Sequence, residues 1–329
     1  MQIVGVNGFG RIGRYFTRMT LENSNVDVAV VNDLADVETL AHLFKYDSIH
    51  RRLKYEFKIE ENKIVFENGK EILFISERNP ENIKWAEYGV EVVLESTGVF
   101  RTTASASKHL VGGAKKVVLS APAKDEETRT VVLGINEDEL QSEDLIISNA
   151  SCTTNSAAPI VRVMKTLCEI ESIFISTIHS YTSDQRLLDA PHSDLRRARA
   201  AAESIVPTTT GAADALVKIF PEFTGKIGGV GIRVPVPDGS MTDLTFICKD
   251  APSVGKIVSA MKSASENELK GILGFTNDPI VSADIIGDPH SCIFDAQLTK
   301  VIGNMVKVVA WYDNEAGYSN RLVDLIESL

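Results

Sequence analysis

A cysteine and a histidine are the residues of this 329-residue chain best placed for covalent chemistry. Cys152 follows the apolar run at residues 145–147 and opens an apolar-periodic segment that ends at Leu167, which predicts a strand feeding a helix. The first turn of a helix offers free N–H groups and a positive dipole end, so we expect the thiol pKa of Cys152 to be lowered. Cys152 is therefore the predicted nucleophile, and the alternative is a small buried apolar side chain.

His179 is the best-placed general base among the six histidines. It lies at or near the predicted end of a strand, where loops carry functional groups. An imidazole close to a thiol is the usual activator of a cysteine nucleophile. The alternative, a hydrogen-bonded or solvated histidine without a catalytic role, suits the other five. Because Cys152 and His179 are both present, a catalytically silent binding or scaffold protein is disfavoured.

A glycine pattern near the N-terminus predicts a dinucleotide site. Gly8, Gly10 and Gly13 match G-x-G-x-x-G between a strand-like run and a helix-compatible segment. In that motif the first glycine allows the turn, the second lets the backbone approach a pyrophosphate, and the third packs helix on strand. A second β-branched run at residues 26–31 leads to Asp33, where a carboxylate can accept bonds from an adenosine ribose. The alternatives are an ordinary strand-to-helix turn and an N-cap aspartate.

Three later segments combine arginines, hydroxyls and glycines as anion sites do. They are the basic loop at residues 194–199, the helix opening at residues 207–213 and the stretch at residues 232–239. Arginine forks and hydroxyl-plus-glycine helix openings bind phosphate oxygens. The alternative is that the arginines of the first loop pair with acids at a loop or subunit contact, which we expect for at least one of them.

The order of the expected elements predicts an α/β protein with two domains. Residues 1–149 alternate strands and helices, as in a Rossmann-type doubly wound parallel sheet, with two antiparallel hairpins inserted at residues 53–75. Ser120 and residues 96–98 follow two of its strands and are candidate nicotinamide-side contacts. Residues 150–314 have longer strands and predict a second α+β domain on a mixed, mostly antiparallel sheet. A terminal helix at residues 315–329 is expected to pack back on the first domain.

Composition excludes several classes of protein. The balance of 34 basic and 45 acidic residues gives a net charge of −11, which offers no pull toward nucleic acid or anionic lipid. The chain has no apolar run long enough for a membrane span and no leader-like segment after Met1, so we expect a cytoplasmic protein. The four cysteines are scattered without C-x-x-C pairing, so we expect reduced thiols and no metal site.

Taken together, these motifs resemble those of the phosphorylating glyceraldehyde-3-phosphate dehydrogenases, over essentially the whole chain. The resemblance rests on Asn7-Gly-Phe-Gly-Arg-Ile-Gly13, Ser151-Cys-Thr-Thr-Asn155, His179-Ser-Tyr-Thr-Ser-Asp-Gln185, Asp194-Leu-Arg-Arg-Ala-Arg199, Arg233-Val-Pro-Val-Pro237 and Trp311-Tyr-Asp-Asn-Glu315. It implies a homotetramer that oxidises glyceraldehyde 3-phosphate with NAD and inorganic phosphate. It also implies that the loop at about residues 182–203 packs against a neighbouring subunit's cofactor.

The resemblance assigns roles residue by residue. The implied dinucleotide contacts are Arg11, Ile12, Asp33, Arg78, Ser120 and Asn314. The implied contacts of the two phosphate sites are Ser151, Thr153, Thr182, Arg197, Thr210, Gly211 and Arg233. The implied chemistry is attack of the Cys152 thiolate on the aldehyde, proton removal by His179 as hydride leaves, and release of the resulting thioester by phosphate. The alternative enzyme is an erythrose-4-phosphate dehydrogenase, which shares the cysteine motif.

Four positions depart from the common pattern of the family. Ser156 stands where many members have a second cysteine, and Ala316 replaces a frequent tryptophan. Arg51-Arg52 follows His50 where glycine is usual, and Ala190 stands where NAD-preferring members often have leucine. Ala190 opens space beside the cofactor, whereas Asp33 should still repel a 2′-phosphate, so NAD remains the expected cofactor.

Overall fold

The computed structural model describes residues 1–329, and the chain divides into two compact units. Unit 1 comprises Met1–Val131, Asp138–Ala150 and Ser319–Leu329, and unit 2 comprises Val132–Glu137 and Ser151–Tyr318. The element alternation along the sequence agrees with this, because unit 1 contains short strands separated by helices and unit 2 contains longer strands.

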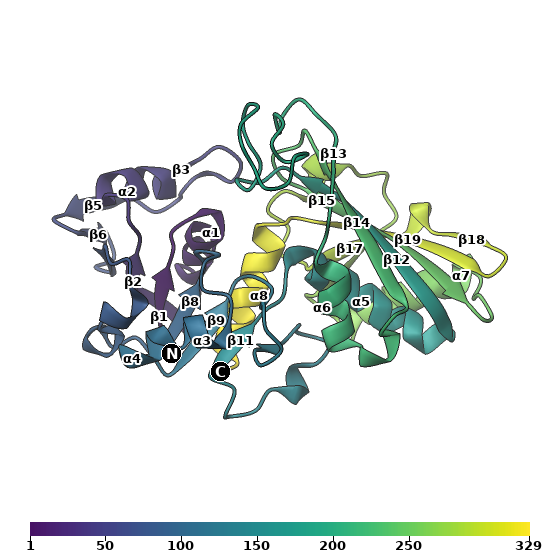
Figure 1. Ribbon diagram of the computed structural model, residues 1–329, viewed down its shortest axis with the longest axis horizontal. Coiled ribbons are helices and arrows are strands. Elements are labelled where there is room, and N and C mark those ends of the chain that lie inside the picture. The colour runs from purple at the N-terminus through teal and green to yellow at the C-terminus, as the bar shows by residue number, and fades with distance from the viewer. The chain divides into compact units, whose positions relative to one another are not determined.

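Unit 1 is built on a nine-stranded sheet in the order β10-β11-β9-β8-β1-β2-β7-β6-β5. Every pair from β10 to β7 is parallel, whereas β6 pairs antiparallel with both β7 and β5 (Figure 1). The strands are β1 (Gln2–Asn7), β2 (Val26–Asn32), β5 (Phe57–Glu60), β6 (Lys63–Phe66), β7 (Glu71–Ile75), β8 (Val92–Glu95), β9 (Lys116–Leu119), β10 (Arg129–Thr130) and β11 (Ile146–Ser148). The predicted parallel sheet with two antiparallel hairpins is confirmed.

The helices of unit 1 connect these strands. They are α1 (Arg11–Thr20), α2 (Val37–Lys45), α3 (Thr103–Ala106) and α4 (Lys108–Val111), with a two-stranded β3 (Tyr46–Asp47) and β4 (Arg51–Arg52) after α2. The last helix, α8 (Ala316–Glu327), returns to unit 1, where Asn23 and Asn25 donate hydrogen bonds to the carboxylate of Glu327 over 3.3 and 2.5 Å. The helices α3 and α4 follow each other directly, because Ser107 is both the C-cap of α3 and the N-cap of α4.

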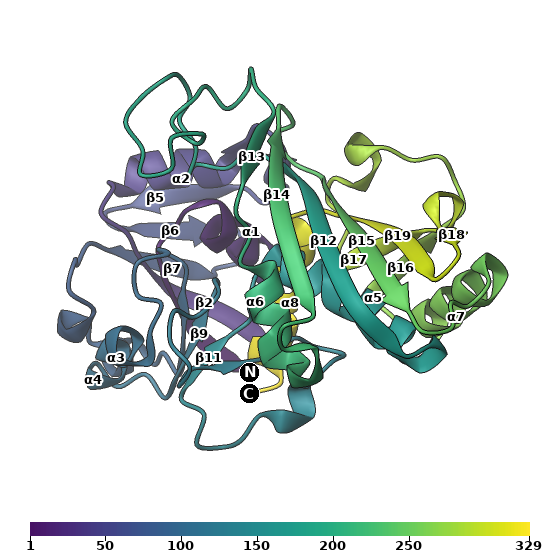
Figure 2. The same cartoon turned by 45° about the vertical axis from the view of Figure 1, so that its right-hand side comes forward.

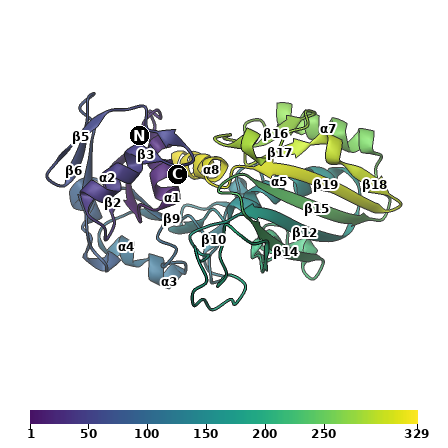
Figure 3. The same ribbon diagram turned by 90° about the horizontal axis from the view of Figure 1, so that it is seen from above.

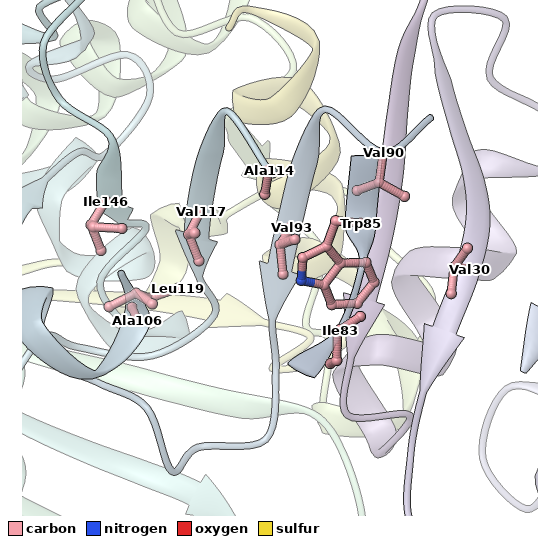
Figure 4. Packing of buried hydrophobic residues seen from close by; sticks show 10 residues of the cluster. All are labelled: Val30, Ile83, Trp85, Val90, Val93, Ala106, Ala114, Val117, Leu119 and Ile146. Carbon is pink, nitrogen blue, oxygen red and sulfur yellow. The ribbon is translucent and has the colours of Figure 1, made fainter. Parts of the chain in front are cut away.

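The core of unit 1 lies where its central strands meet the loop that precedes β8. Trp85 is fully buried and packs with Val90 and Val93 (Figure 4). Its indole N–H donates to His109 Nδ1 over 3.1 Å, so the one polar group of this ring is satisfied inside the core. The central strands β8 and β9 are almost wholly buried, and each contains the apolar run Val-Val-Leu rather than an alternation of apolar and polar residues.

Unit 2 is built on an eight-stranded sheet in the order β13-β14-β12-β15-β19-β17-β16, with β18 paired to β19. The β12–β14 and β16–β17 pairs are parallel and the others antiparallel, so the sheet is mixed and mostly antiparallel as predicted (Figure 2). The strands are β12 (Ile170–Ser180), β13 (Val206–Thr208), β14 (Ile227–Val234), β15 (Ser240–Cys248), β16 (Leu273–Thr276), β17 (Cys292–Asp295), β18 (Lys300–Ile302) and β19 (Met305–Tyr312).

Three helices cover one face of this sheet. They are α5 (Cys152–Leu167), α6 (Ala212–Ile219) and α7 (Val254–Glu266), and α5 packs against both of the others and against β12, β15, β17 and β19 (Figure 3). Ile257, Met261 and Ala264 form the buried stripe of α7. The opposite face of the sheet is less covered, because alternate side chains of β15 are half-buried and Phe174 of β12 is 50% exposed.

Candidate active site and dinucleotide site

The N-terminus of α5 places Cys152 at the first helical position. Ser151 is the N-cap, and its hydroxyl accepts a hydrogen bond from Thr154 N over 3.1 Å. Ala150 precedes it in the left-handed region with φ of 53° and is fully buried. Cys152 follows two residues later and is half-buried beside the first-turn N–H groups of α5. The predicted strand-to-helix arrangement around the thiol is therefore confirmed.

The structure brings the two predicted catalytic residues together. Cys152 Sγ lies 3.5 Å from His179 Nε2. His179 is the penultimate residue of β12 and is buried, and its Nδ1 lies 2.7 Å from Ser180 O. The Ser180 carbonyl can only accept, which favours the ring proton on Nδ1, whereas the Arg233 guanidinium, 2.7 Å from the same nitrogen, can only donate, which favours the proton on Nε2. A base for the thiol needs the first tautomer, in which the Nε2 lone pair faces Cys152.

Arg233 lies beside this pair because of strand register. β12 and β14 are parallel with His179 opposite Arg233, and the guanidinium Nη1 lies 2.7 Å from His179 Nδ1 and donates to Ser180 O over 3.0 Å. Its hydrogen bonds go to neutral partners, and it forms no ion pair with a carboxylate. A largely buried guanidinium in that position favours the binding of an anion beside it.

The ionisation of the pair differs from the sequence-based expectation. Burial raises the pKa of the Cys152 thiol, and the opposing effects of Arg233 and of the hydrogen bonds around Thr153 are smaller. Burial and then Arg233 lower the pKa of His179 to about 3. The expected lowering of the thiol pKa is wrong in this structure, because desolvation outweighs the helix terminus. The resting pair is a neutral thiol facing a neutral imidazole.

Tyr312 is a residue of this site that sequence reasoning missed. Its hydroxyl lies 2.9 Å from Thr153 Oγ1 and 3.0 Å from Thr177 Oγ1, so it ties the first turn of α5 to β12. Burial raises its pKa, which keeps the phenol neutral. The only sequence signal was its position two residues before Asn314 in a motif already singled out.

Asn314 is held by a second buried network. Its side-chain oxygen accepts hydrogen bonds from Ser180 Oγ over 2.7 Å and from Ser240 Oγ over 2.8 Å. The neighbouring turn is fixed by Asp313, whose carboxylate accepts from the backbone N–H groups of residues 315 and 316. Because the amide oxygen is used internally, the orientation of the Asn314 amide group is determined by unit 2 itself.

The basic loop lies before β13, and its arginines pair with acids as the alternative interpretation held. Arg197 forms an ion pair with Asp184 and donates from Nε to Thr208 Oγ1 over 2.7 Å, and Arg199 pairs with Asp189 over 3.1 Å. Thr208 lies in β13 opposite Gly231 of β14, which is two residues before Arg233. Arg197 therefore lies on the same side of the site as Arg233. Burial lowers the pKa of Arg233, and the positive charge of Arg197 lowers it further.

The remaining predicted phosphate contacts surround this region. Thr182 is half-buried in the loop after β12, where its backbone exchanges hydrogen bonds with Gln185. Thr210 Oγ1 accepts from Ala212 N over 3.3 Å, and Gly211 is the N-cap of α6 without a side-chain cap. The N–H of Ala212 is therefore used by Thr210, and the other first-turn N–H groups of α6 form a helix terminus that can bind an anion.

The glycine turn in unit 1 has the geometry that its motif predicted. Gly8 has φ of +96°, and a Cβ there would lie 2.7 Å from Thr97 N. A Cβ on Gly13 would lie 2.2 Å from Gly8 O, whereas a Cβ on Gly10 would meet nothing within 4 Å. The first and third glycines are thus required by the turn and by helix packing, and the space at the second is open. With no side-chain cap at Gly10, this terminus of α1 fits a pyrophosphate.

The acidic residue after β2 is fixed against this turn. Asp33 accepts hydrogen bonds from Phe9 N over 2.7 Å and from Ala35 N over 3.1 Å. Its own N–H donates to Ile75 O, which brings the exposed Arg78 loop after β7 to the same edge of the sheet. Ser120 lies directly after β9 at this edge, with its N–H bonded to Glu95 O.

Arg11 and Ile12 open α1 below the glycine turn. The Arg11 guanidinium is bidentate to Asp47, over 2.5 and 3.2 Å. Burial opposes ionisation of Asp47, but the hydrogen bonds from Arg11 and from two backbone N–H groups lower its pKa to about 2. The Arg11 side chain is therefore engaged within unit 1, which leaves its backbone N–H at the helix terminus as its means of contacting a ligand.

Comparison with known proteins matches both units. Residues 2–103 match the family model of the glyceraldehyde 3-phosphate dehydrogenase NAD binding domain, and residues 151–314 match that of the C-terminal domain. Proteins named glyceraldehyde-3-phosphate dehydrogenase from Geobacillus stearothermophilus and Bacillus subtilis are 53% and 50% identical to it over 98% of this chain and 96% of theirs. The chain belongs to the glyceraldehyde-3-phosphate dehydrogenase family.

This membership confirms the resemblance seen in the motifs and the predicted NAD cofactor, since the matched N-terminal model is that of an NAD-binding domain. The similar protein from Streptomyces avermitilis, 53% identical over 98% of this chain, also has the glyceraldehyde enzyme's name, so the erythrose-4-phosphate alternative is not favoured. None of the helices of this family member has the length and apolar character needed to cross a membrane.

Proposed function

We propose that the chain catalyses the NAD-dependent oxidative phosphorylation of glyceraldehyde 3-phosphate to 1,3-bisphosphoglycerate, through a thioester on Cys152. The observation that carries this proposal is the 3.5 Å contact between Cys152 Sγ and His179 Nε2 at the N-terminus of α5, with Arg233 beside them. A thiol, a neutral base and an unpaired guanidinium suit covalent oxidation of an aldehyde whose chain carries phosphate.

The neutral pair sets the order of proton transfers. As Cys152 attacks the aldehyde carbon, its proton passes to His179 Nε2, and the Nδ1–H bond to Ser180 O stabilises the imidazolium. The first-turn N–H groups of α5 donate to the developing oxyanion. The ring returns this proton to the oxyanion, which gives the hemithioacetal hydroxyl, and takes it back as hydride departs; NAD when bound supplies the hydride acceptor. The thioester that remains is released by attack of inorganic phosphate.

The anion contacts are proposed on the same basis. Arg233 lies beside the Cys152–His179 pair, and Arg197 lies next to β13, which pairs with the strand that carries Arg233. We assign the two phosphate-binding regions to these arginines and to the hydroxyl and N–H groups around them, namely Ser151, Thr153, Thr182, Thr210 and Gly211. The ion pairs of Arg197 make it a fixed donor rather than a mobile one.

The dinucleotide contacts follow from the glycine turn. We assign the pyrophosphate to the open terminus of α1 at Gly10, Arg11 and Ile12, and the adenosine ribose to Asp33. Arg78 and Ser120 lie at the same edge of the unit 1 sheet. Asn314 is assigned to the nicotinamide, because its amide group is rigidly oriented by Ser180 and Ser240.

We also propose that the enzyme is a cytoplasmic homotetramer. The loop at residues 182–203 exposes Leu187, Leu188 and Leu195 by 82%, 73% and 81%, which is costly for a single chain and suits a neighbouring subunit. All four cysteines are free thiols, which suits a reducing compartment. Sedimentation equilibrium should give four times the chain mass of 35.9 kDa, and a monomer would contradict the assembly.

The decisive test of the reaction is NADH formation with each aldehyde, with and without phosphate. Glyceraldehyde 3-phosphate should be oxidised far more efficiently than erythrose 4-phosphate, and sustained turnover should require phosphate. Cys152→Ser should bind NAD yet lose oxidation almost completely, and iodoacetamide should label Cys152 ahead of the other three thiols, because His179 Nε2, 3.5 Å from the sulfur, can take the thiol proton during attack. Turnover retained in Cys152→Ser would refute the assignment of the nucleophile.

The assignment of the attacking phosphate has its own test. Arg197→Ala should raise the phosphate concentration needed for half-maximal rate while leaving NAD affinity nearly unchanged. Arg199→Ala is the matched control, because Arg199 lies in the same loop and has an acidic partner of its own. An unchanged phosphate requirement in Arg197→Ala, or an equal change in Arg199→Ala, would count against the assignment.

A further inference from the structure

Two thiols far from Cys152 are brought into direct contact in unit 2. Cys168 directly follows α5 and is half-buried, and Cys248 is the last residue of β15 and is fully buried. Their sulfur atoms lie 3.0 Å apart although 80 residues separate them in the sequence. The sequence pattern showed only scattered cysteines, so this pair is a product of the fold.

Hydrogen bonds fix the backbone at both cysteines of the pair. Cys168 N donates to Met164 O over 3.3 Å, which closes the last turn of α5. Cys248 N donates to Asn304 O, and the next residue bonds to Glu169 O over 3.0 Å. β12 and β15 are antiparallel here, with Ile170 opposite Cys248. A disulfide needs a sulfur separation of about 2.05 Å, so the two atoms must approach by only about 1 Å, which side-chain rotation can supply.

We propose that Cys168 and Cys248 are a redox-active dithiol that forms a reversible intramolecular disulfide under hydrogen peroxide. The peroxide O–O bond breaks as Cys168 sulfur takes one oxygen to become a sulfenic acid, and water leaves. Cys248 sulfur then attacks Cys168 sulfur, the S–O bond breaks, and a second water leaves with the proton of Cys248. The two thiols lose two electrons and two protons to the peroxide, and a dithiol reductant restores them.

The surroundings assign different roles to the two sulfurs. Cys168 is the accessible one, so it meets the oxidant. Burial, then the hydrogen bond from Cys168 and the charge of Glu171, raise the pKa of Cys248 to about 12, so Cys248 resolves the sulfenic acid as a neutral thiol. That step is slow for a thiol. The disulfide should accordingly accumulate over sustained exposure rather than within seconds.

The link would connect the C-terminal end of α5 to β15. Because α5 has 16 residues, Cys152 lies at its other end, about 24 Å away, and is not consumed. A cross-link that closes a long loop restricts the unfolded chain, so the oxidised protein should unfold at a higher temperature. The pair would therefore strengthen the unit that holds the nucleophile under the oxidising conditions that threaten it.

The test uses the full-length Cys152→Ser protein, so that peroxide cannot act on the nucleophile. After treatment with hydrogen peroxide and alkylation of remaining thiols under denaturing conditions, trypsin should yield residues 166–186 joined to residues 234–249, two hydrogens lighter than the separate peptides. Dithiothreitol should release them. The linked species should be absent when Cys168→Ser is added, and Cys292 should remain alkylatable as an internal control.

Thermal unfolding provides the second measurement. The oxidised Cys152→Ser protein should have a Tm several degrees above that of its reduced form, and peroxide should not raise the Tm once Cys168→Ser is added. Cys248→Ala should also abolish the rise, and because Cys168→Ser changes the more accessible partner, misfolding of one variant would leave the other informative. Conversion of Cys168 to a sulfinic acid with Cys248 still alkylatable, or linkage between chains, would overturn the proposal.

Discussion

Cofactor choice depends on a carboxylate that the structure holds in place. Asp33 receives N–H bonds from Phe9 and Ala35, so one oxygen faces the glycine turn and the side chain cannot rotate away without losing both bonds. A 2′-phosphate on the ribose would bring a second negative charge within a few ångströms of it. By the family pattern, Ala190 stands where a leucine would fill space, but added volume does not remove charge repulsion.

The size of the effect can be worked from Coulomb's law. Two unit charges about 4 Å apart cost about 4 kcal/mol at an effective dielectric constant of about 20. Because Asp33 is only half-buried, solvent and salt reduce this to about 2.7 kcal/mol, which is a factor of about 100. We therefore expect kcat/KM for NAD to exceed that for NADP by at least about 100-fold. Asp33→Asn retains an oxygen for Phe9 N but removes the charge, so the ratio should fall toward about 1.

The assay is steady-state NADH or NADPH formation at fixed aldehyde and phosphate, at low and high ionic strength. Asp36→Asn is the matched control, because Asp36 caps α2 three residues later and accepts from Thr39 rather than from the glycine turn. It should leave the ratio unchanged. Comparable efficiency with both cofactors in the unmutated protein would refute the electrostatic argument and make Ala190 the more informative residue.

Three further predictions concern the site and its scaffold. The pKa of His179 is lowered from 6.5 to about 3, so below about pH 6.5 the unfolded chain binds a proton that the folded chain does not. The free energy of unfolding should therefore fall as pH drops from about 6.5 toward about 3. His179→Asn should flatten this pH dependence in urea titrations, and an unchanged slope would contradict the lowered pKa. Tyr312→Phe should lower the free energy of unfolding by about 1–3 kcal/mol, because two buried threonine hydroxyls lose their partner; unaltered stability would show that they find another. Arg51→Gly should raise it by about 0.5–1 kcal/mol, because Arg51 has φ of 67°, and a measured loss would mean that the side chain contributes more than the strain costs.

Much of the site could be predicted from the sequence, because it depends on residues that are neighbours along the chain. The left-handed turn at Gly8, the close packing at Gly13 and the start of α5 at Cys152 are all local arrangements. Spacing within a strand, turn and helix determines them, since each is decided by backbone sterics and by hydrogen bonds over a few residues. The family motifs also assigned roles to residues such as Arg233, but they did not show which contacts fix the position of the Arg233 side chain.

Other features depend on contacts that no local pattern encodes. The 3.5 Å approach of Cys152 to His179 requires α5 to pack on β12, and the position of Arg233 requires the parallel register of β12 and β14. The thiol pKa is raised rather than lowered because desolvation is a property of everything packed around the sulfur. The Cys168–Cys248 contact likewise joins a helix end to a strand end 80 residues away. Burial and long-range pairing depend on residues from the whole folded unit, so they can be determined only from the tertiary structure.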